Sequence, residues 1–138
     1  MTLPHPYVIP GLILVIPDNN VRVIRLMSPD EILDVAEDFM LVPRGFSRKV
    51  GRGADVVECR HLAAFAMKQF KKMTCTAIGE VMNKDHTTII YGWQRIENLM
   101  TTDPNYATKI KYFTEALYTS KLKQNDNKNQ AFEAAESD

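Results

Sequence analysis

The sequence lacks the features that mark several common classes of protein. Its two cysteines, Cys59 and Cys75, form no C-x-x-C pair and have no pair of histidines nearby, so neither a disulfide framework nor a zinc site is indicated. The longest apolar stretch, residues 8–16, is interrupted by Pro10 and Gly11 and has no lysine or arginine before it. It is too short for a membrane span and unlike a signal peptide. We therefore expect a cytoplasmic protein with reduced thiols and without a metal or a cofactor.

The chain as a whole has no net charge, because its 17 basic and 17 acidic residues cancel, but the charges are unevenly distributed. Residues 1–43 carry 2 basic and 6 acidic groups, residues 44–95 carry 10 and 4, and residues 96–138 carry 5 and 7. The middle third therefore has a net charge of +6, between flanks of −4 and −2. Because a charged partner responds to the local distribution of charge, the middle third is where we expect an anionic partner to bind.

The first part of the chain, residues 1–27, is predicted to be a β-rich arm. Two β-rich runs, 12–16 and 21–26, flank the turn-forming residues 17–20, which indicates a short hairpin. A lone hairpin is only marginally stable in water. Its apolar face should therefore lie on the rest of the protein or on a partner.

From Ser28 the pattern becomes helical. Ser28 is an N-cap followed by Pro29 at the first helical position and Glu31 at the third, which predicts a helix to about residue 40. N-caps at Asp55 and Asp85, together with helical stripes of apolar residues, predict four more helices, over about 55–72, 74–82, 85–102 and 104–122. The inward-facing residues of the five helices are Ile32, Val35, Ala36 and Phe39; Leu62, Phe65, Ala66, Gln69 and Phe70; Ile78, Val81 and Met82; Ile89, Ile90, Trp93, Ile96 and Met100; and Tyr106, Ile110, Phe113 and Leu117.

These elements predict a mainly α protein whose globular domain covers residues 28–121. A chain of 138 residues, 45% of them hydrophobic, is long enough for one such domain with a core. After Leu122 the sequence is polar, so residues 122–138 are predicted to be a disordered tail or frayed helix.

The third and fourth predicted helices have the plan of a helix-turn-helix: a short helix, a tight turn at residues 83–84, and a longer helix with an apolar rear face. Its polar first turn favours a recognition helix in the major groove of DNA. There an aspartate can accept from cytosine N4, a histidine can donate or accept, and a threonine methyl can touch thymine methyls. The four residues of this turn are Asp85, His86, Thr87 and Thr88.

The same residues carry a family resemblance. Residues 28–120 resemble the C-terminal DNA-binding domain, domain IV, of the bacterial replication initiator DnaA, chiefly in 78–90, 95–97 and 60–63. The resemblance implies a Trp-repressor-like helical bundle that binds an asymmetric box on duplex DNA as a monomer. The chain has no G-x-x-x-x-G-K-[ST] loop and no room for an ATPase domain. We expect a stand-alone box reader that regulates replication or transcription in a bacterium or a phage.

The resemblance also implies roles for single residues. Arg52, in the basic loop 42–54, would enter the minor groove, and Asp85, His86 and Thr87 would face bases in the major groove with Thr88 beside them. A second set would hold phosphates: Arg48, Lys49, Arg60, His61, Lys68, Thr76 and Lys84.

Simpler interpretations of these residues stay open. The run 85–88 is also what a well-capped helix start looks like. The basic loop could be ordinary solvated surface. Trp93 is better explained as core than as a stacking platform, since it shares a stripe with Ile89 and Ile96.

Two rival functions come from other classes. The first is a module that docks on a replication protein through the apolar run 12–16, because large apolar patches usually mark interfaces. The second is an enzyme acting on nucleic acid through Asp85, His86 or a thiol. No cluster of carboxylates for magnesium accompanies these groups in the sequence, so we expect no catalytic activity.

Overall fold

The computed structural model describes residues 7–8, 15–48 and 53–136. This part of the chain is mainly α, as predicted. It contains two short strands, six α-helices and one 3-10 turn. Their bounds are β1 (Tyr7–Val8), β2 (Val15–Ile16), α1 (Asp18–Arg25), α2 (Pro29–Met40), η1 (Phe46–Arg48), α3 (Ala54–Gln69), α4 (Cys75–Met82), α5 (His86–Thr102) and α6 (Pro104–Glu136).

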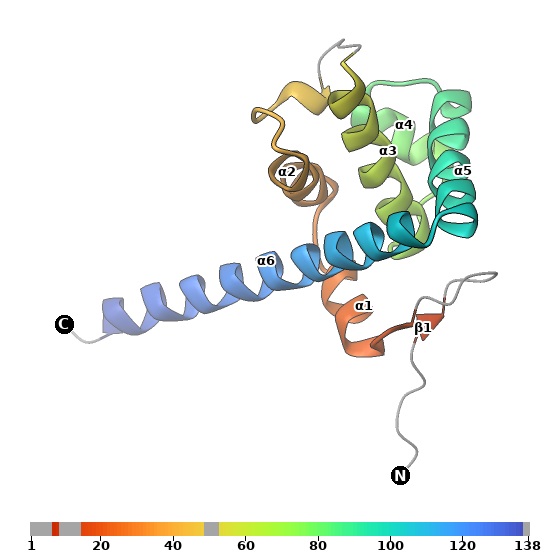
Figure 1. The fold of residues 1–138 in the computed structure, drawn as a ribbon. Helices are drawn as coiled ribbons and strands as arrows, with labels where there is room; N and C mark the ends of the chain where they lie inside the picture. The colour runs from red at the N-terminus through yellow and green to blue at the C-terminus, as the bar shows by residue number, and fades with distance from the viewer. Residues whose placement is uncertain (1–6, 9–14, 49–52, 137–138) are drawn as a thin grey trace.

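The core lies around α3, which packs against α2 and α5, while α4 packs against α5 (Figure 1). Six consecutive residues of α3, 62–67, are buried, so this part of the helix is enclosed on all sides. Phe65 and Phe70 fill the space around it, together with Phe113 from α6. Each such side chain contributes roughly 1.5–3 kcal/mol by leaving water. The five helices predicted between residues 28 and 121 correspond to α2 through α6.

Helix α2 begins as its sequence predicts. The Ser28 hydroxyl accepts a hydrogen bond from the Glu31 backbone N–H at 3.1 Å, and Pro29 occupies the first turn. The helix ends where Leu41 adopts a left-handed conformation, with φ of 57°. This turn directs the chain back along the end of α2 into the basic loop.

The predicted hairpin is wrong in its second strand. Residues 21–26 do not form a strand, because all but the last of them lie in α1 (Asp18–Arg25). Strand β2 instead pairs with the upstream β1 in antiparallel register, Tyr7 opposite Ile16. Val21 and Ile24 are buried on one face of α1, which packs against α6. This burial at helical spacing outweighs the β propensity of the valines and isoleucine.

Helix α3 differs slightly from the prediction at both ends. Its N-cap is Gly53 and not Asp55, and no side chain accepts a hydrogen bond there. Asp55 lies instead in the first turn, where a carboxylate is favourable beside the positive end of the helix dipole. The helix ends at Gln69, before Lys72 adopts a left-handed conformation.

Helix α6 continues beyond the predicted helix end near residue 122. It runs from Pro104 to Glu136 as a long rod that extends past the other helices (Figure 1). No proline or glycine follows Pro104 to interrupt it, and extending a helix costs less than starting one. The division of the chain into a domain over 28–121 and a separate tail stays a prediction.

Candidate nucleic-acid interface

The turn between α4 and α5 is tight because several backbone groups close it. Thr74 caps α4 by accepting a hydrogen bond from the Ala77 N–H at 3.1 Å. At the other end Asn83 adopts a left-handed conformation with φ of 56°, as asparagine does more easily than most residues. The Lys84 N–H then donates to the Gly79 carbonyl oxygen at 2.8 Å. The start of α5 is therefore held in a fixed position against α4.

The first turn of α5 carries the four residues predicted to read bases, and all four are exposed. Asp85 occupies the N-cap position, but its side chain accepts no capping hydrogen bond from the helix backbone, contrary to our expectation. Its carboxylate accepts a hydrogen bond from the Thr87 hydroxyl at 2.7 Å, and Nδ1 of His86 lies 2.9 Å from its other oxygen. The three side chains thus form one exposed polar cluster.

This cluster has an electrostatic consequence. The hydrogen bond from Thr87, and then the neighbouring His86, lower the pKa of Asp85 below its usual value. The carboxylate is therefore ionised at neutral pH and acts only as a hydrogen-bond acceptor. In the absence of DNA, Asp85, His86 and Thr87 are thus paired with one another.

Two hollows border the first turn of α5, and residues that are distant in the sequence line them together with it. A hollow of about 70 Å³ on the α3 side is lined by Arg60, His61, Lys84 and Thr88, among others. A second hollow, of about 400 Å³, lies at the α4–α5 turn and is lined by Thr76, Lys84, Asp85 and His86, among others. Lys84 belongs to both. The fold thus gathers three of the predicted phosphate-binding residues, Arg60, His61 and Lys84, on one side of the helix.

His61 is less exposed than a surface helix residue. It is half-buried between α3 and α5, where its ring would lie 2.7 Å from a Cβ added at Gly92. Its ring also packs edge-on against Tyr91, at 6.0 Å between centroids. Burial, and then the charges of Arg95 and Arg60, lower the pKa of His61. The imidazole is therefore neutral at neutral pH.

Lys68 and Trp93 lie together on another part of the α3–α5 contact. The Lys68 ammonium is 5.8 Å from the centre of the Trp93 ring. Trp93 is half-buried and packs against the core, so the core interpretation is only partly right. Lys68 lines neither of the two hollows at the first turn of α5.

Part of the predicted site lies outside the described residues. Lys49 and Arg52 are not described, and the structure gives the backbone of Arg48 but not the position of its side chain. Their contacts with DNA stay predictions. The apolar run proposed as a docking surface is likewise not described over residues 12–14, and that interpretation stays a prediction as well.

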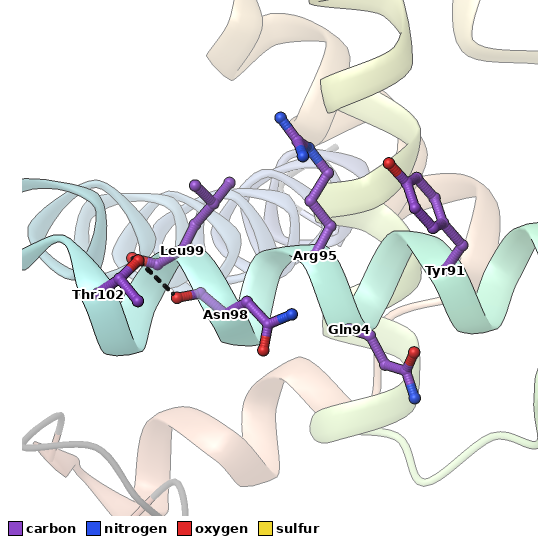
Figure 2. Close-up of a pocket in the computed structure, with 6 residues that line it drawn as sticks. All are labelled: Tyr91, Gln94, Arg95, Asn98, Leu99 and Thr102. Carbon is purple, nitrogen blue, oxygen red and sulfur yellow. Dashed lines mark hydrogen bonds between the residues drawn. The ribbon is translucent and has the colours of Figure 1, made fainter.

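Sequence reasoning missed an exposed face on the remainder of α5, shown in Figure 2. A shallow hollow of about 300 Å³ runs along it. Tyr91 and Arg95 point to one side of the helix in this view, and Gln94 and Asn98 to the other. These groups bind phosphate oxygens readily. The signal that could have revealed them is their spacing of three and four residues, opposite the buried stripe. The residues that line the hollow are Tyr91, Gln94, Arg95, Asn98, Leu99 and Thr102.

The side chains and helices of the described part of the chain also bear on metal binding and membrane insertion. No three histidine, cysteine or acidic side chains there are grouped so as to hold a metal ion. None of its helices has the length and apolar character needed to cross a membrane. Cys59 is buried and Cys75 half-buried, and the two do not form a disulfide.

The family of the chain follows from a comparison with known protein families. Residues 29–96, which run from α2 through most of α5, match the family described as the bacterial DnaA protein helix-turn-helix. The chain belongs to this family through these residues. A DnaA-type helix-turn-helix is a DNA-binding module, so the matched segment is of the DNA-binding class. All the residues predicted to contact DNA lie within it.

Curated relatives agree with the family match. The chain is 31% identical over 83 residues to the chromosomal replication initiator protein DnaA of Flavobacterium psychrophilum, covering 59% of this chain and 17% of the relative. It is 32% identical over 85 residues to the protein of that name from Treponema pallidum, covering 61% and 18%. The protein of that name from Roseiflexus castenholzii is 27% identical over 104 residues, covering 75% and 21%. The chain thus spans about a fifth of the length of these DnaA proteins.

Proposed function

We propose that the chain reads a specific sequence of duplex DNA as a monomer, with the first turn of α5 in the major groove. The observation that carries the proposal is the arrangement around this turn. An exposed cluster of acceptor and donor groups, Asp85, His86 and Thr87, stands beside a hollow lined by Arg60 and Lys84. Polar groups that meet base edges, with cations beside them for phosphates, are what a recognition helix requires.

The two sets of residues have different tasks. In the proposed complex, the Asp85 carboxylate accepts from a cytosine amino group, while His86 and Thr87 contact the neighbouring base edges. Bases that enter this cluster have to replace the hydrogen bonds that the three side chains make with one another. A wrong base separates the side chains without offering them new partners, and this penalises binding. Lys84 and Arg60 neutralise phosphates and fix the position of the duplex. In the proposed complex, Arg52 enters the minor groove and Lys49 holds a phosphate, although both lie outside the described residues.

The biological role that we propose is the control of replication or transcription at such a site. The relatives are named as chromosomal replication initiators, which supports a role at an origin. A protein bound to one specific site at an origin or a promoter can regulate replication or transcription by occupying that site.

Selection of bound sites from a pool of random duplexes tests this function. We expect the protein to enrich one asymmetric sequence. Lys84→Ala should weaken binding to the enriched sequence and to all other duplexes by about the same factor, since a phosphate contact carries no sequence information. Lys111→Ala, which removes an exposed lysine from α6, serves as the matched control and should bind like the parent. A bound pool without any enriched sequence would overturn the proposal.

A further inference from the structure

The buried carboxylate of Glu37 has an unusual position for an acid beside a DNA-binding surface. Glu37 lies near the end of α2 and is fully buried. One of its oxygens accepts three hydrogen bonds: from the Gly45 N–H at 2.9 Å, the Ser47 N–H at 3.0 Å and the Ser47 hydroxyl at 2.7 Å. A buried charge is costly unless hydrogen bonds compensate it. The carboxylate therefore fixes residues 45–47, in the first half of the basic loop, against α2.

Ser47 connects this carboxylate to the candidate interface. Its side chain is itself buried, and its carbonyl oxygen accepts a hydrogen bond from Nε of Arg60 on α3 at 2.9 Å. Arg60 in turn lines the hollow beside Lys84 and Thr88. One residue thus stands between the buried acid of α2 and a cation of the proposed DNA-binding surface.

A second set of contacts holds the same segment from outside. The Arg44 guanidinium binds Asp34 at 3.1 Å and Asp38 at 2.9 Å. Val42 donates its N–H to the backbone carbonyl oxygen of Glu37 at 2.8 Å. The Arg44 pairs are exposed, and exposed ion pairs contribute little to stability. The buried hydrogen bonds of the Glu37 side chain therefore hold Ser47 more firmly than these exposed pairs do.

We propose that Glu37 is a positioning residue for DNA binding: through Ser47 it holds Arg60 at the phosphate-binding hollow without touching DNA itself. This inference rests on the proposed DNA-binding function. It assigns a role to an acidic residue from the part of the sequence whose net charge is negative. It also makes α2 part of the binding apparatus, although none of the predicted contact residues lies on that helix.

The sign of the expected effect separates this role from simple electrostatics. Removal of a negative charge near the surface should strengthen binding to DNA if only the overall field matters. Loss of the Glu37 carboxylate should instead weaken binding, because Ser47 and then Arg60 lose their fixed positions. The slope of log affinity against log salt should also become shallower by about 0.9, the value for one phosphate contact.

The test compares Glu37→Gln with Asp38→Asn, which removes an exposed carboxylate from the same helix and changes the net charge equally. Affinity for one duplex is measured across a range of salt concentrations, and urea unfolding shows that each variant is folded. We expect Glu37→Gln to bind about tenfold more weakly, as for loss of a hydrogen bond to a charged group, with the shallower slope. Asp38→Asn should bind as well as the parent or better. Arg60→Ala should have the same slope as Glu37→Gln, and adding Glu37→Gln to it should cause little further loss.

Ser47→Ala removes only the hydroxyl donor and provides the second variant if Glu37→Gln is poorly folded. It should weaken binding and lower the slope in the same direction. If both variants are folded and keep the parent's slope, or if Glu37→Gln weakens binding equally with and without Arg60, the positioning role is wrong while DNA binding stands. If the parent itself does not bind duplex DNA, both proposals fail.

Discussion

Gly79 of α4 faces the carbonyl oxygen of Lys84, which would lie only 2.5 Å from a Cβ added at position 79. The obstructing atom is backbone, so it cannot move aside as the end of a side chain would. The close approach of α4 to the turn therefore requires glycine at this position. It also sets where the first turn of α5 lies, because Lys84 directly precedes that turn.

The first prediction concerns this contact. Gly79→Ala should lower the free energy of unfolding by about 1–3 kcal/mol, as overpacking usually does. It should also weaken binding to a selected DNA site, because the turn is displaced. Gly53→Ala is the comparison, since a Cβ there would meet only Val56 at an ordinary 3.9 Å and its cost is limited to the preference for glycine over alanine at an N-cap. Urea unfolding measures the effect, and equal stabilities of the two variants would show that the turn tolerates the added methyl.

The second prediction concerns His61 and pH. The pKa of His61 is lowered in the folded protein by burial, Arg95 and Arg60, an effect that Glu58 partly opposes. As the pH falls below about 6.5, the ordinary histidine value, the unfolded chain takes up a proton that the folded chain resists. The stability that neutral His61 provides is thus present above that pH and is lost below it. His61→Gln should lose less stability than the parent between pH 7.5 and pH 5.5 in urea unfolding, and parallel losses would contradict the assignment.

The exposed face of α5 in Figure 2 gives the third prediction. If the DNA backbone passes along it, Arg95→Ala should weaken binding uniformly across sequences and make the salt slope shallower by about 1. Lys123→Ala, on an exposed part of α6, removes the same charge elsewhere and is the control. Affinities of both variants for one duplex at several salt concentrations decide the matter. An unchanged slope in Arg95→Ala would place this face outside the DNA interface.

The sequence predicted the helices whose signals are local. Ser28 predicts the start of a helix and Asn83 the end of one, each by its own capping chemistry. In the structure, Ser28 is the N-cap of α2 and Asn83 is the C-cap of α4. The strand predicted over 21–26 was wrong because burial of Val21 and Ile24 depends on α6, far away in the sequence. Propensity cannot show such a contact.

The candidate site was predictable only in part, for the same reason. The first turn of α5 is contiguous in sequence and could be read directly. The convergence of Arg60 with Lys84 depends on how α3 crosses α5. Glu37 was missed because an acidic residue on an amphipathic helix looks like solvated surface. Only the fold shows that Glu37 is buried and accepts a hydrogen bond from Ser47 in the basic loop.

The fourth prediction is the salt dependence of binding by the parent protein. About six phosphate or groove contacts should give a slope of roughly −5 in log affinity against log salt, although the net charge is zero. Deletion of residues 123–138 should change this slope little, because charges beyond a Debye length of about 8 Å are screened at physiological salt. A slope shallower than about −2 would mean too few contacts for this interface. The contributing residues are expected to be Arg48, Lys49, Arg52, Arg60, Lys68 and Lys84.

The central claim is that the first turn of α5 reads bases, and it is tested most directly by position-resolved binding to the selected site. His86→Ala and Thr87→Val are compared with Thr101→Val, an exposed threonine near the other end of the same helix. Each of the first two should lose about 1–3 kcal/mol of affinity on the selected site and discriminate less at one or two base positions. Their non-specific binding, and all binding by Thr101→Val, should stay near the parent's. Unchanged affinity and unchanged base preference in both His86→Ala and Thr87→Val would contradict the assignment of α5 as the recognition helix.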